Sequence, residues 1–238
     1  MKKHLVVFLA FQYPAIISRS FDSLENIDAD FFIVENKTER SPEIENYFKN
    51  KSLIGYIQFQ NNIANSAMTI FIKEYIAMLQ EYQFITFTDG DLFVANAKDI
   101  FDEIFEAFGR NPEIAVSSAD LWTGNDYRNT VKLDDKDYLK DATNNNRIFG
   151  SIEGNTGNFL LTVQNHDLNL VSNMIFVDSF ISQKVNANNR RWYKTLKNLA
   201  YHLTWDLYIE GHEYYEWKKQ VYNTIWFKEQ HSDFKKIK

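Results

Sequence analysis

Two aspartates separated by one glycine, Asp89-Gly90-Asp91, are the residues of this sequence best suited to do chemistry. They directly follow Phe84–Thr88, an apolar run with the length and composition of a buried strand. Carboxylates two residues apart project to the same side of an extended chain, about 6–7 Å from each other. Such a pair beside apolar walls needs a cation, and oxygen ligands suit Mg²⁺ or Mn²⁺. We therefore predict a divalent metal site here, although the same tripeptide also forms ordinary surface turns.

Asp206 is a candidate general base in the second half of the sequence. We interpret Arg191–Ile209 as a helix with Asp206 at the edge of an apolar stripe. The stripe consists of Leu196, Leu199, Leu203 and Leu207. Partial withdrawal from water raises the pKa of a carboxylate, which is what a base that accepts a proton from a hydroxyl needs. The alternative is an ordinary boundary aspartate paired with His202, one turn earlier.

The elements that must position these residues alternate between strand and helix, which predicts an α/β protein with a mostly parallel sheet. The expected strands are Leu5–Phe11, Asp30–Glu35, Ile54–Phe59, Phe84–Thr88 and Ile114–Ser117. The expected helices are Ala15–Leu24, one starting at Ser41, Ala67–Tyr82, and Lys98–Phe108 ending at Gly109. Ligands of such sheets bind beyond the carboxyl ends of the strands, so residues just after each strand are the candidates for a site.

The second half has a different character. Residues 123–147 are polar and rich in Asn and Asp, which predicts a long surface loop. Gly154–Asn158 is a candidate floor for a second substrate or a plain turn, and a strand is expected over Gly157–Val163. Helices are expected over Asn169–Ser182 and Arg191–Ile209, the latter ending before Gly211.

The run Phe84–Phe93 resembles the DXD segment of GT-A glycosyltransferases, especially those similar to family 2. The resemblance implies that Asp91 ligates a metal ion bridging the donor diphosphate, with Asp89 beside it near the ribose and the metal's water shell. Asp206 matches the family's late aspartate, which deprotonates the acceptor. A late histidine, His231, is implied as a further ligand, so the implied metal set is Asp89, Asp91 and His231, holding Mn²⁺ or Mg²⁺.

The resemblance also implies a site for the donor nucleotide. The turn after the first strand, the acidic residue after the second and the Asn-rich segment before the third helix match the family's donor contacts. Gly90 lets the backbone approach a ligand closely. The glycine and arginine usual in the donor loop are absent here. The alternative interpretation of each of the three segments is a plain polar loop. The implied donor-binding residues are Phe11, Tyr13, Glu35, Asn62, Asn65, Asp89 and Gly90.

As a whole, the resemblance implies one GT-A domain over residues 1–238, with a Rossmann-like, mostly parallel sheet flanked by helices. Residues 1–118 would form the nucleotide-sugar half, and residues 119–238 a helical acceptor half. The implied activity is inverting, metal-dependent transfer from a nucleotide-diphosphate sugar, such as a UDP sugar, to a carbohydrate or lipid-linked glycan acceptor. The implied role is glycan or surface polysaccharide synthesis.

Three other classes of protein remain open. A sugar-phosphate nucleotidyltransferase shares this sheet type, but its Gly-rich loop after the first strand has no counterpart in Phe11–Ser20. A glycoside hydrolase uses paired carboxylates without metal or nucleotide. A sugar-binding or scaffold protein with a degenerate site would keep the fold without the chemistry.

Composition sets limits on partners and location. The net charge of −6 argues against a nucleic-acid partner, which needs a basic footprint. The chain has no Cys, which fits a reducing cytoplasm and excludes thiolate metal sites. Lys2 and Lys3 before Leu5–Phe11 resemble the start of a secretory signal, but a buried strand accounts for the same residues. The lysines at 235, 236 and 238 predict at most peripheral membrane contact.

Overall fold

A computed structural model of the chain describes residues 2–121, 160–207 and 211–238, apart from the side chains of Leu196, Lys197, Trp205 and Asp206. Its described strands form one sheet in the order β5-β8-β6-β7-β4-β1-β2-β3-β9. The strands are β1 (Lys2–Ala10), β2 (Asp30–Glu35), β3 (Gly55–Phe59), β4 (Tyr82–Asp89), β5 (Leu92–Phe93), β6 (Ile114–Leu121), β7 (Leu161–Gln164), β8 (Arg191–His202) and β9 (Phe234–Lys236).

The sheet is mostly parallel, as predicted. β1 lies between β2 and β4 and is parallel to both, and β3 is parallel to β2. β7 is antiparallel to both β4 and β6, so β4 and β6 run in the same direction, and β8 is parallel to β6. The edge strands β5 and β9 are antiparallel to their neighbours.

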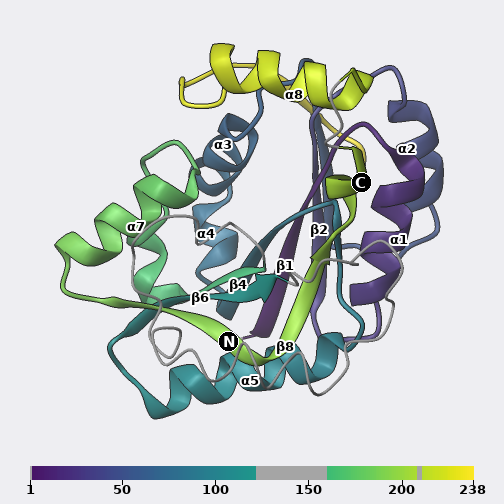
Figure 1. Ribbon diagram of the computed structural model, residues 1–238. Coiled ribbons are helices and arrows are strands. Elements are labelled where there is room, and N and C mark those ends of the chain that lie inside the picture. The colour runs from purple at the N-terminus through teal and green to yellow at the C-terminus, as the bar shows by residue number, and fades with distance from the viewer. Residues whose placement is uncertain (1, 122–159, 208–210) are drawn as a thin grey trace.

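Helices cover both faces of the sheet because successive side chains of a buried strand point to opposite faces. In β1, Leu5 and Val7 belong to one core and Val6 and Phe8 to the other. One face carries α1 (Pro14–Leu24), α2 (Ser41–Phe48) and α5 (Ala97–Arg110), and the other carries α3 (Ser66–Glu74), α4 (Ile76–Leu79) and α7 (Asp178–Ala187) (Figure 1). This arrangement leaves the carboxyl ends of β1, β2 and β4 at one edge of the sheet.

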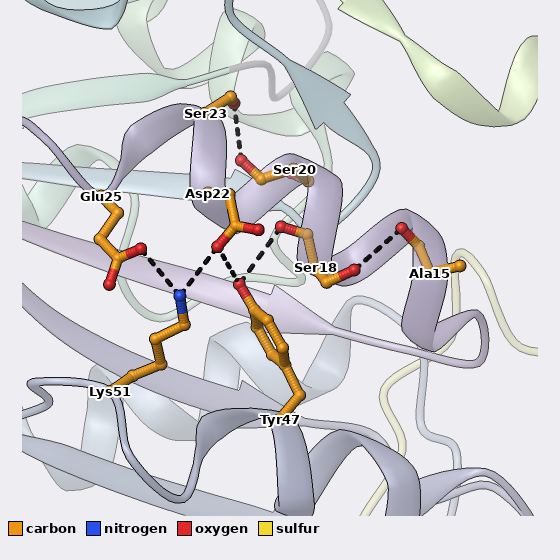
Figure 2. Close-up of polar contacts among 8 residues, drawn as sticks. All are labelled: Ala15, Ser18, Ser20, Asp22, Ser23, Glu25, Tyr47 and Lys51. Atoms are coloured by element: carbon orange, nitrogen blue, oxygen red, sulfur yellow. Dashed lines mark hydrogen bonds and ion pairs between the residues drawn. The ribbon is translucent and has the colours of Figure 1, made fainter.

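α1, which begins directly after the turn that follows β1, is held against α2 by a polar network (Figure 2). The Tyr47 hydroxyl donates to Asp22 Oδ1 at 2.6 Å, and Lys51 Nζ lies 2.8 Å from both Asp22 Oδ1 and Glu25 Oε2. These contacts are largely exposed and individually weak, but they share partners and so fix the relative positions of the two helices.

α8 (Glu213–Thr224) lies over the carboxyl-end edge of the sheet (Figure 1). The backbone N–H of Tyr214 donates to His212 Nδ1 at 3.1 Å, which caps the start of the helix. Glu213 and Glu216 in the first turn complement the helix dipole. In the described part of the chain, no helix has both the length and the apolar character needed to cross a membrane.

Two predicted helices of the second half are wrong. Arg191–His202 is the strand β8, and Leu203–Leu207 is a 3₁₀ helix, η3. β8 has buried apolar residues on both faces, such as Trp192 and Tyr193, and a strand of this kind lacks the alternation that separates it from a helix. Asn169–Ser182 is also not one helix: a 3₁₀ helix, η2, spans Asn165–Leu170, and α7 begins only at Asp178.

Smaller boundaries also differ from prediction. The expected helix Ala67–Tyr82 divides into α3 and α4, and Tyr82 already belongs to β4. Gly109 does not end α5, which continues to Arg110. The part of the chain after residue 119 is not purely helical, since it also contributes β7, β8 and β9 to the sheet. The predicted loop 123–147 and the segment Gly154–Asn158 lie outside the described residues.

Candidate functional site

A cavity of about 90 Å³ lies between α8 and the carboxyl ends of β1, β2 and β4. A second cavity of about 790 Å³ adjoins it, sharing Phe11, Tyr13, Ile16, Asn62 and Trp217 as walls. The polar residues of the smaller cavity are Asn36, Asn62, Asn65, Asp89, Asp91, His202, Thr204 and Lys218. Its aromatic residues are Phe11, Tyr13, Tyr214, Trp217 and Trp226.

Most of the residues singled out from the sequence line this one cavity. They are Phe11, Tyr13, Asn62, Asn65, Asp89, Gly90 and Asp91. His231 does not line it, because it lies exposed in the connection between α8 and β9. Asp206 lies in η3 rather than on a long helix, so the apolar stripe that suggested its raised pKa does not exist, and its side chain is outside the described part.

Glu35, which the resemblance implies as a donor contact, is buried and lines neither cavity. Its Oε2 accepts hydrogen bonds from the Tyr56 hydroxyl and from Gln58 Nε2, the latter at 3.0 Å, and burial raises its pKa. Asn36, the next residue, lines the cavity instead. Neighbouring residues of an extended chain point to opposite faces, so Asn36 reaches the cavity where Glu35 does not.

Asn36 holds the Asn-rich segment in place. Its Oδ1 accepts from the backbone N–H of Ile63 at 3.1 Å, and its Nδ2 donates to the carbonyl oxygen of Ala64 at 3.2 Å. Asn62 Oδ1 in turn accepts from the backbone N–H of Ala64 at 3.0 Å. These bonds fix the loop that brings Asn65 to the cavity.

Asp89 ends β4, and Gly90 holds the aspartate pair against the end of β1. A Cβ atom on Gly90 would lie 2.6 Å from the carbonyl oxygen of Leu9, so only glycine fits this contact without a shift of the backbone. Burial, together with the charge of Asp91, raises the pKa of Asp89 to about 7. The two carboxylates therefore form an electrostatically unfavourable pair unless a cation or a proton is shared between them.

Asp91 also contacts His202, the last residue of β8, and Thr204 of η3. The hydroxyl of Thr204 donates to Asp91 Oδ2 at 2.8 Å, and His202 Nε2 lies 3.5 Å from the same oxygen. Burial lowers the pKa of His202, although Asp91 opposes this effect. Neither residue was predicted as part of the site, because the sequence pattern favoured one long helix where β8 ends and η3 begins.

The inward face of α8 supplies the roof of the cavity. Tyr214, Trp217, Lys218 and Val221 line it, at the i, i+3, i+4 and i+7 spacing of one helix face. Burial lowers the pKa of Lys218, while the charges of Asp91 and Asp89 oppose that change. Lys218 Nζ also lies 4.1 Å from the ring centroid of Trp226. This helical spacing was the signal that could have identified the face from the sequence.

Three residues that line the cavity have a buried polar atom without a hydrogen-bond partner among the described residues. These atoms are the acceptor Oδ1 of Asp91, the donor Nδ2 of Asn65 and the hydroxyl of Tyr13. An acceptor and a donor left open in one cavity are best explained by a ligand or ordered solvent, because buried polar groups are otherwise paired. Together with the aromatic walls, they give the cavity the character of a binding site.

The carboxylates of Asp89 and Asp91 suit a divalent cation whose remaining ligands are oxygen atoms from water or substrate. In the described ranges, no group of three or more His, Asp and Glu side chains is placed to hold a metal ion. Mg²⁺, however, is commonly held by one or two carboxylates, with water and substrate phosphates as its remaining ligands. Asp89, together with the open oxygen of Asp91, fits that pattern. The fold and site thus define an α/β protein with a polar, aromatic-walled cavity at the carboxyl edge of its sheet.

No family model matches the chain. “Uncharacterized protein L142” of Acanthamoeba polyphaga mimivirus is 30% identical over 219 residues, which cover 84% of this chain and 43% of that protein. “Uncharacterized protein L137” of the same virus is 26% identical over 222 residues, covering 85% of this chain and 29% of that protein. The chain therefore spans less than half the length of these curated relatives.

Solved structures with partial likeness include a protein described as a nucleotide-diphospho-sugar transferase from Desulfovibrio desulfuricans. It has a TM-score of 0.45 and 9% identity, covering 82% of this chain and 80% of that one. The apo structure of the bifunctional glycosyltransferase WbbM has a TM-score of 0.40 and 14% identity, covering 82% of this chain and 39% of that one. At these scores, the likenesses identify neither a family nor an activity for this chain.

Proposed function

We propose that this chain is a metal-dependent glycosyltransferase domain that uses a nucleotide-diphosphate sugar as donor. The observation that carries the proposal is the convergence of Asp89, Asp91 and Asn65 on one cavity, with Asp91 Oδ1 and Asn65 Nδ2 lacking partners among the described residues. The cavity lies at the carboxyl ends of parallel strands, where sheets of this type bind ligands. Because the chain spans less than half of its curated relatives, the proposal concerns this region and not a whole protein.

The two adjoining cavities suit the two ends of such a donor. The larger one, about 790 Å³, has the size expected for a nucleoside, and Phe11, Tyr13 and Trp217 offer it ring faces. The smaller one suits the diphosphate and the cation, held by Asp89 and Asp91. A bound Mn²⁺ or Mg²⁺ supplies charge neutralisation to the departing diphosphate. Asn62 lines both cavities and Asn65 lines the smaller one, where their amides can orient the donor.

In this proposal, the acceptor is a hydroxyl of a carbohydrate or lipid-linked glycan, in glycan or surface polysaccharide synthesis. Asp206 is kept as the base that accepts the acceptor's proton, on the strength of its resemblance to the family's late aspartate. Attack opposite to the leaving diphosphate would invert the anomeric configuration. His231 is no longer proposed as a metal ligand, because it is exposed and outside the cavity.

Calorimetric titration of the chain with UDP and GDP, in Mn²⁺ and in chelator, tests the proposal. We expect one nucleotide to bind in Mn²⁺ and at least tenfold more weakly in chelator. Asp91→Asn should remove the Mn²⁺ effect, and Asp233→Asn, at an exposed acid outside the cavity, should leave it unchanged. A folded protein that binds neither nucleotide in Mn²⁺ would contradict the proposal and favour a sugar-binding or scaffold protein with a degenerate site.

A further inference from the structure

Lys218 is the one cationic side chain among the described residues that line the smaller cavity. It is partly buried, and its charge acts on both Asp89 and Asp91. Its amine also lies 4.1 Å from the ring centroid of Trp226, which holds it on the cavity side of α8. The cavity that contains the two carboxylates therefore already contains an amine that acts on them through its charge.

The neighbouring Lys219 shows what an ordinary lysine of this helix does. Lys219 is exposed and lies 3.3 Å from Glu216 on the same helix. Withdrawing an ammonium group from water is costly unless opposite charge compensates it. For Lys218, burial lowers the pKa of the amine, and the charges of Asp91 and Asp89 offset part of that effect. The two adjacent lysines thus differ in partner and burial, which makes them a matched pair for experiment.

A divalent cation and Lys218 cannot be stabilised equally by the same two carboxylates. If the cation binds alone, it either displaces the amine from the pair or stays beside a like charge, and both weaken its binding. A nucleoside diphosphate changes this balance, because its phosphate oxygens offer Lys218 a new anionic partner next to the carboxylates. Cation and diphosphate would then bind together far better than the cation binds alone.

We propose that Lys218 acts as the resident counter-ion of the Asp89–Asp91 pair and, on donor binding, as a ligand of the diphosphate. It thereby makes cation binding depend on the nucleotide. The inference rests on the proposed function and adds a specific residue and a binding order to it. Linkage requires the effect to be reciprocal, so the cation strengthens diphosphate binding by the same factor.

The test measures Mn²⁺ affinity from the electron paramagnetic resonance signal of free Mn²⁺, first without nucleotide and then with saturating UDP or GDP, after subtraction of the Mn²⁺ that the same nucleotide binds in the absence of protein. For the unmodified chain, we expect the nucleotide to tighten Mn²⁺ binding at least tenfold. Lys218→Met should bind Mn²⁺ alone at least tenfold more tightly than the unmodified chain, and the nucleotide should tighten Mn²⁺ binding by a smaller factor than it does in the unmodified chain. Lys219→Met should match the unmodified chain, and Lys218→Arg, which keeps the charge, should retain the coupling.

Two outcomes would overturn the inference. The first is Mn²⁺ affinity of Lys218→Met within twofold of the unmodified chain, or no Mn²⁺ binding by either. The second is Mn²⁺ affinity of the unmodified chain that does not respond to nucleotide, a readout that needs no variant and so does not depend on whether Lys218→Met folds. Nucleotide binding that requires Mn²⁺ but is insensitive to Lys218 would retain the proposed function and reject only this inference.

Discussion

The rings of Phe11 and Trp217 stack with their centroids 4.9 Å apart and their planes inclined by 26°. Phe11 follows β1 and Trp217 lies on α8, so this pair joins the end of the central strand to the helix that roofs the cavity. Tyr13 and Tyr214 make a second, edge-on contact between the same two segments, with centroids 5.6 Å apart. Aromatic contacts thus join the roof of the site to the end of β1; Phe11, Tyr13 and Trp217 line both cavities, and Tyr214 lines the smaller one.

Trp217→Ala is expected to loosen α8. Loss of the stacked pair and of ring burial should lower the free energy of unfolding by about 1–2 kcal/mol and speed hydrogen exchange in α8. Hydrogen exchange followed by mass spectrometry, alongside chemical denaturation, measures both effects. Trp217→Phe keeps a ring against Phe11 and should stay close to the unmodified chain. Unchanged exchange in α8 of Trp217→Ala would show that the stack does not hold the helix.

Gly90→Ala should perturb the aspartate pair itself. The added Cβ would lie 2.6 Å from the carbonyl oxygen of Leu9, so the backbone between Asp89 and Asp91 must move. We expect a loss of about 1–3 kcal/mol in the free energy of unfolding, typical of overpacking, together with weaker Mn²⁺-dependent nucleotide binding. Urea denaturation and calorimetry measure the two effects.

Gly109→Ala is the matched control for that substitution. Gly109 lies inside α5, and an added Cβ would meet no atom within 4 Å. Alanine there should be neutral or should stabilise by about 0.5 kcal/mol, because it reduces the freedom of the unfolded chain and favours the helix. If Gly90→Ala behaves like Gly109→Ala, the close approach at Gly90 does not constrain the site.

Asp89 should make stability fall as the pH rises, when no cation is present. Its pKa in the folded state is raised to about 7 from the ordinary value of 3.8, so between these values the folded state binds more protons than the unfolded state. Asp89→Asn should therefore gain on the order of 2 kcal/mol over the unmodified chain above pH 7, a figure reduced for partial exposure. The gain should vanish near pH 4. Denaturation in chelator across this pH range measures it, and a difference that is constant with pH would contradict the shift.

Substitutions at Asp91 and at Asp206 should impair different steps: the first nucleotide binding with Mn²⁺, the second transfer of the sugar. Asp91→Asn should lose the Mn²⁺ effect on nucleotide binding, because its carboxylate is one of the proposed ligands. Asp206→Asn should keep nucleotide binding but lose at least 100-fold in transfer, as expected for a general base. Calorimetry and a product assay with the donor identified by titration separate the two. Normal transfer by a folded Asp206→Asn would remove that residue from the mechanism.

Local sequence patterns were enough to predict the first half of the fold. Continuous apolar runs such as Leu5–Phe11 and Phe84–Thr88 identified buried parallel strands, and the position of Asp89-Gly90-Asp91 after one of them identified the edge where the cavity lies. The reason is physical: the first half is built of consecutive strand and helix units, so neighbours in sequence remain neighbours in space.

The rest of the site was decided by tertiary structure alone. β8 was mistaken for a helix because a strand buried on both faces has no alternating pattern, and this misplaced His202 and Thr204. Which of the two neighbours Glu35 and Asn36 reaches the cavity depends on the face of the extended chain that each occupies, and strand pairing decides that. Lys218 lines the same cavity as Asp89 and Asp91, more than 120 positions away in sequence, because α8 packs back over the sheet edge. Such long-range packing depends on how all the elements bury their apolar faces together, and no local pattern encodes it.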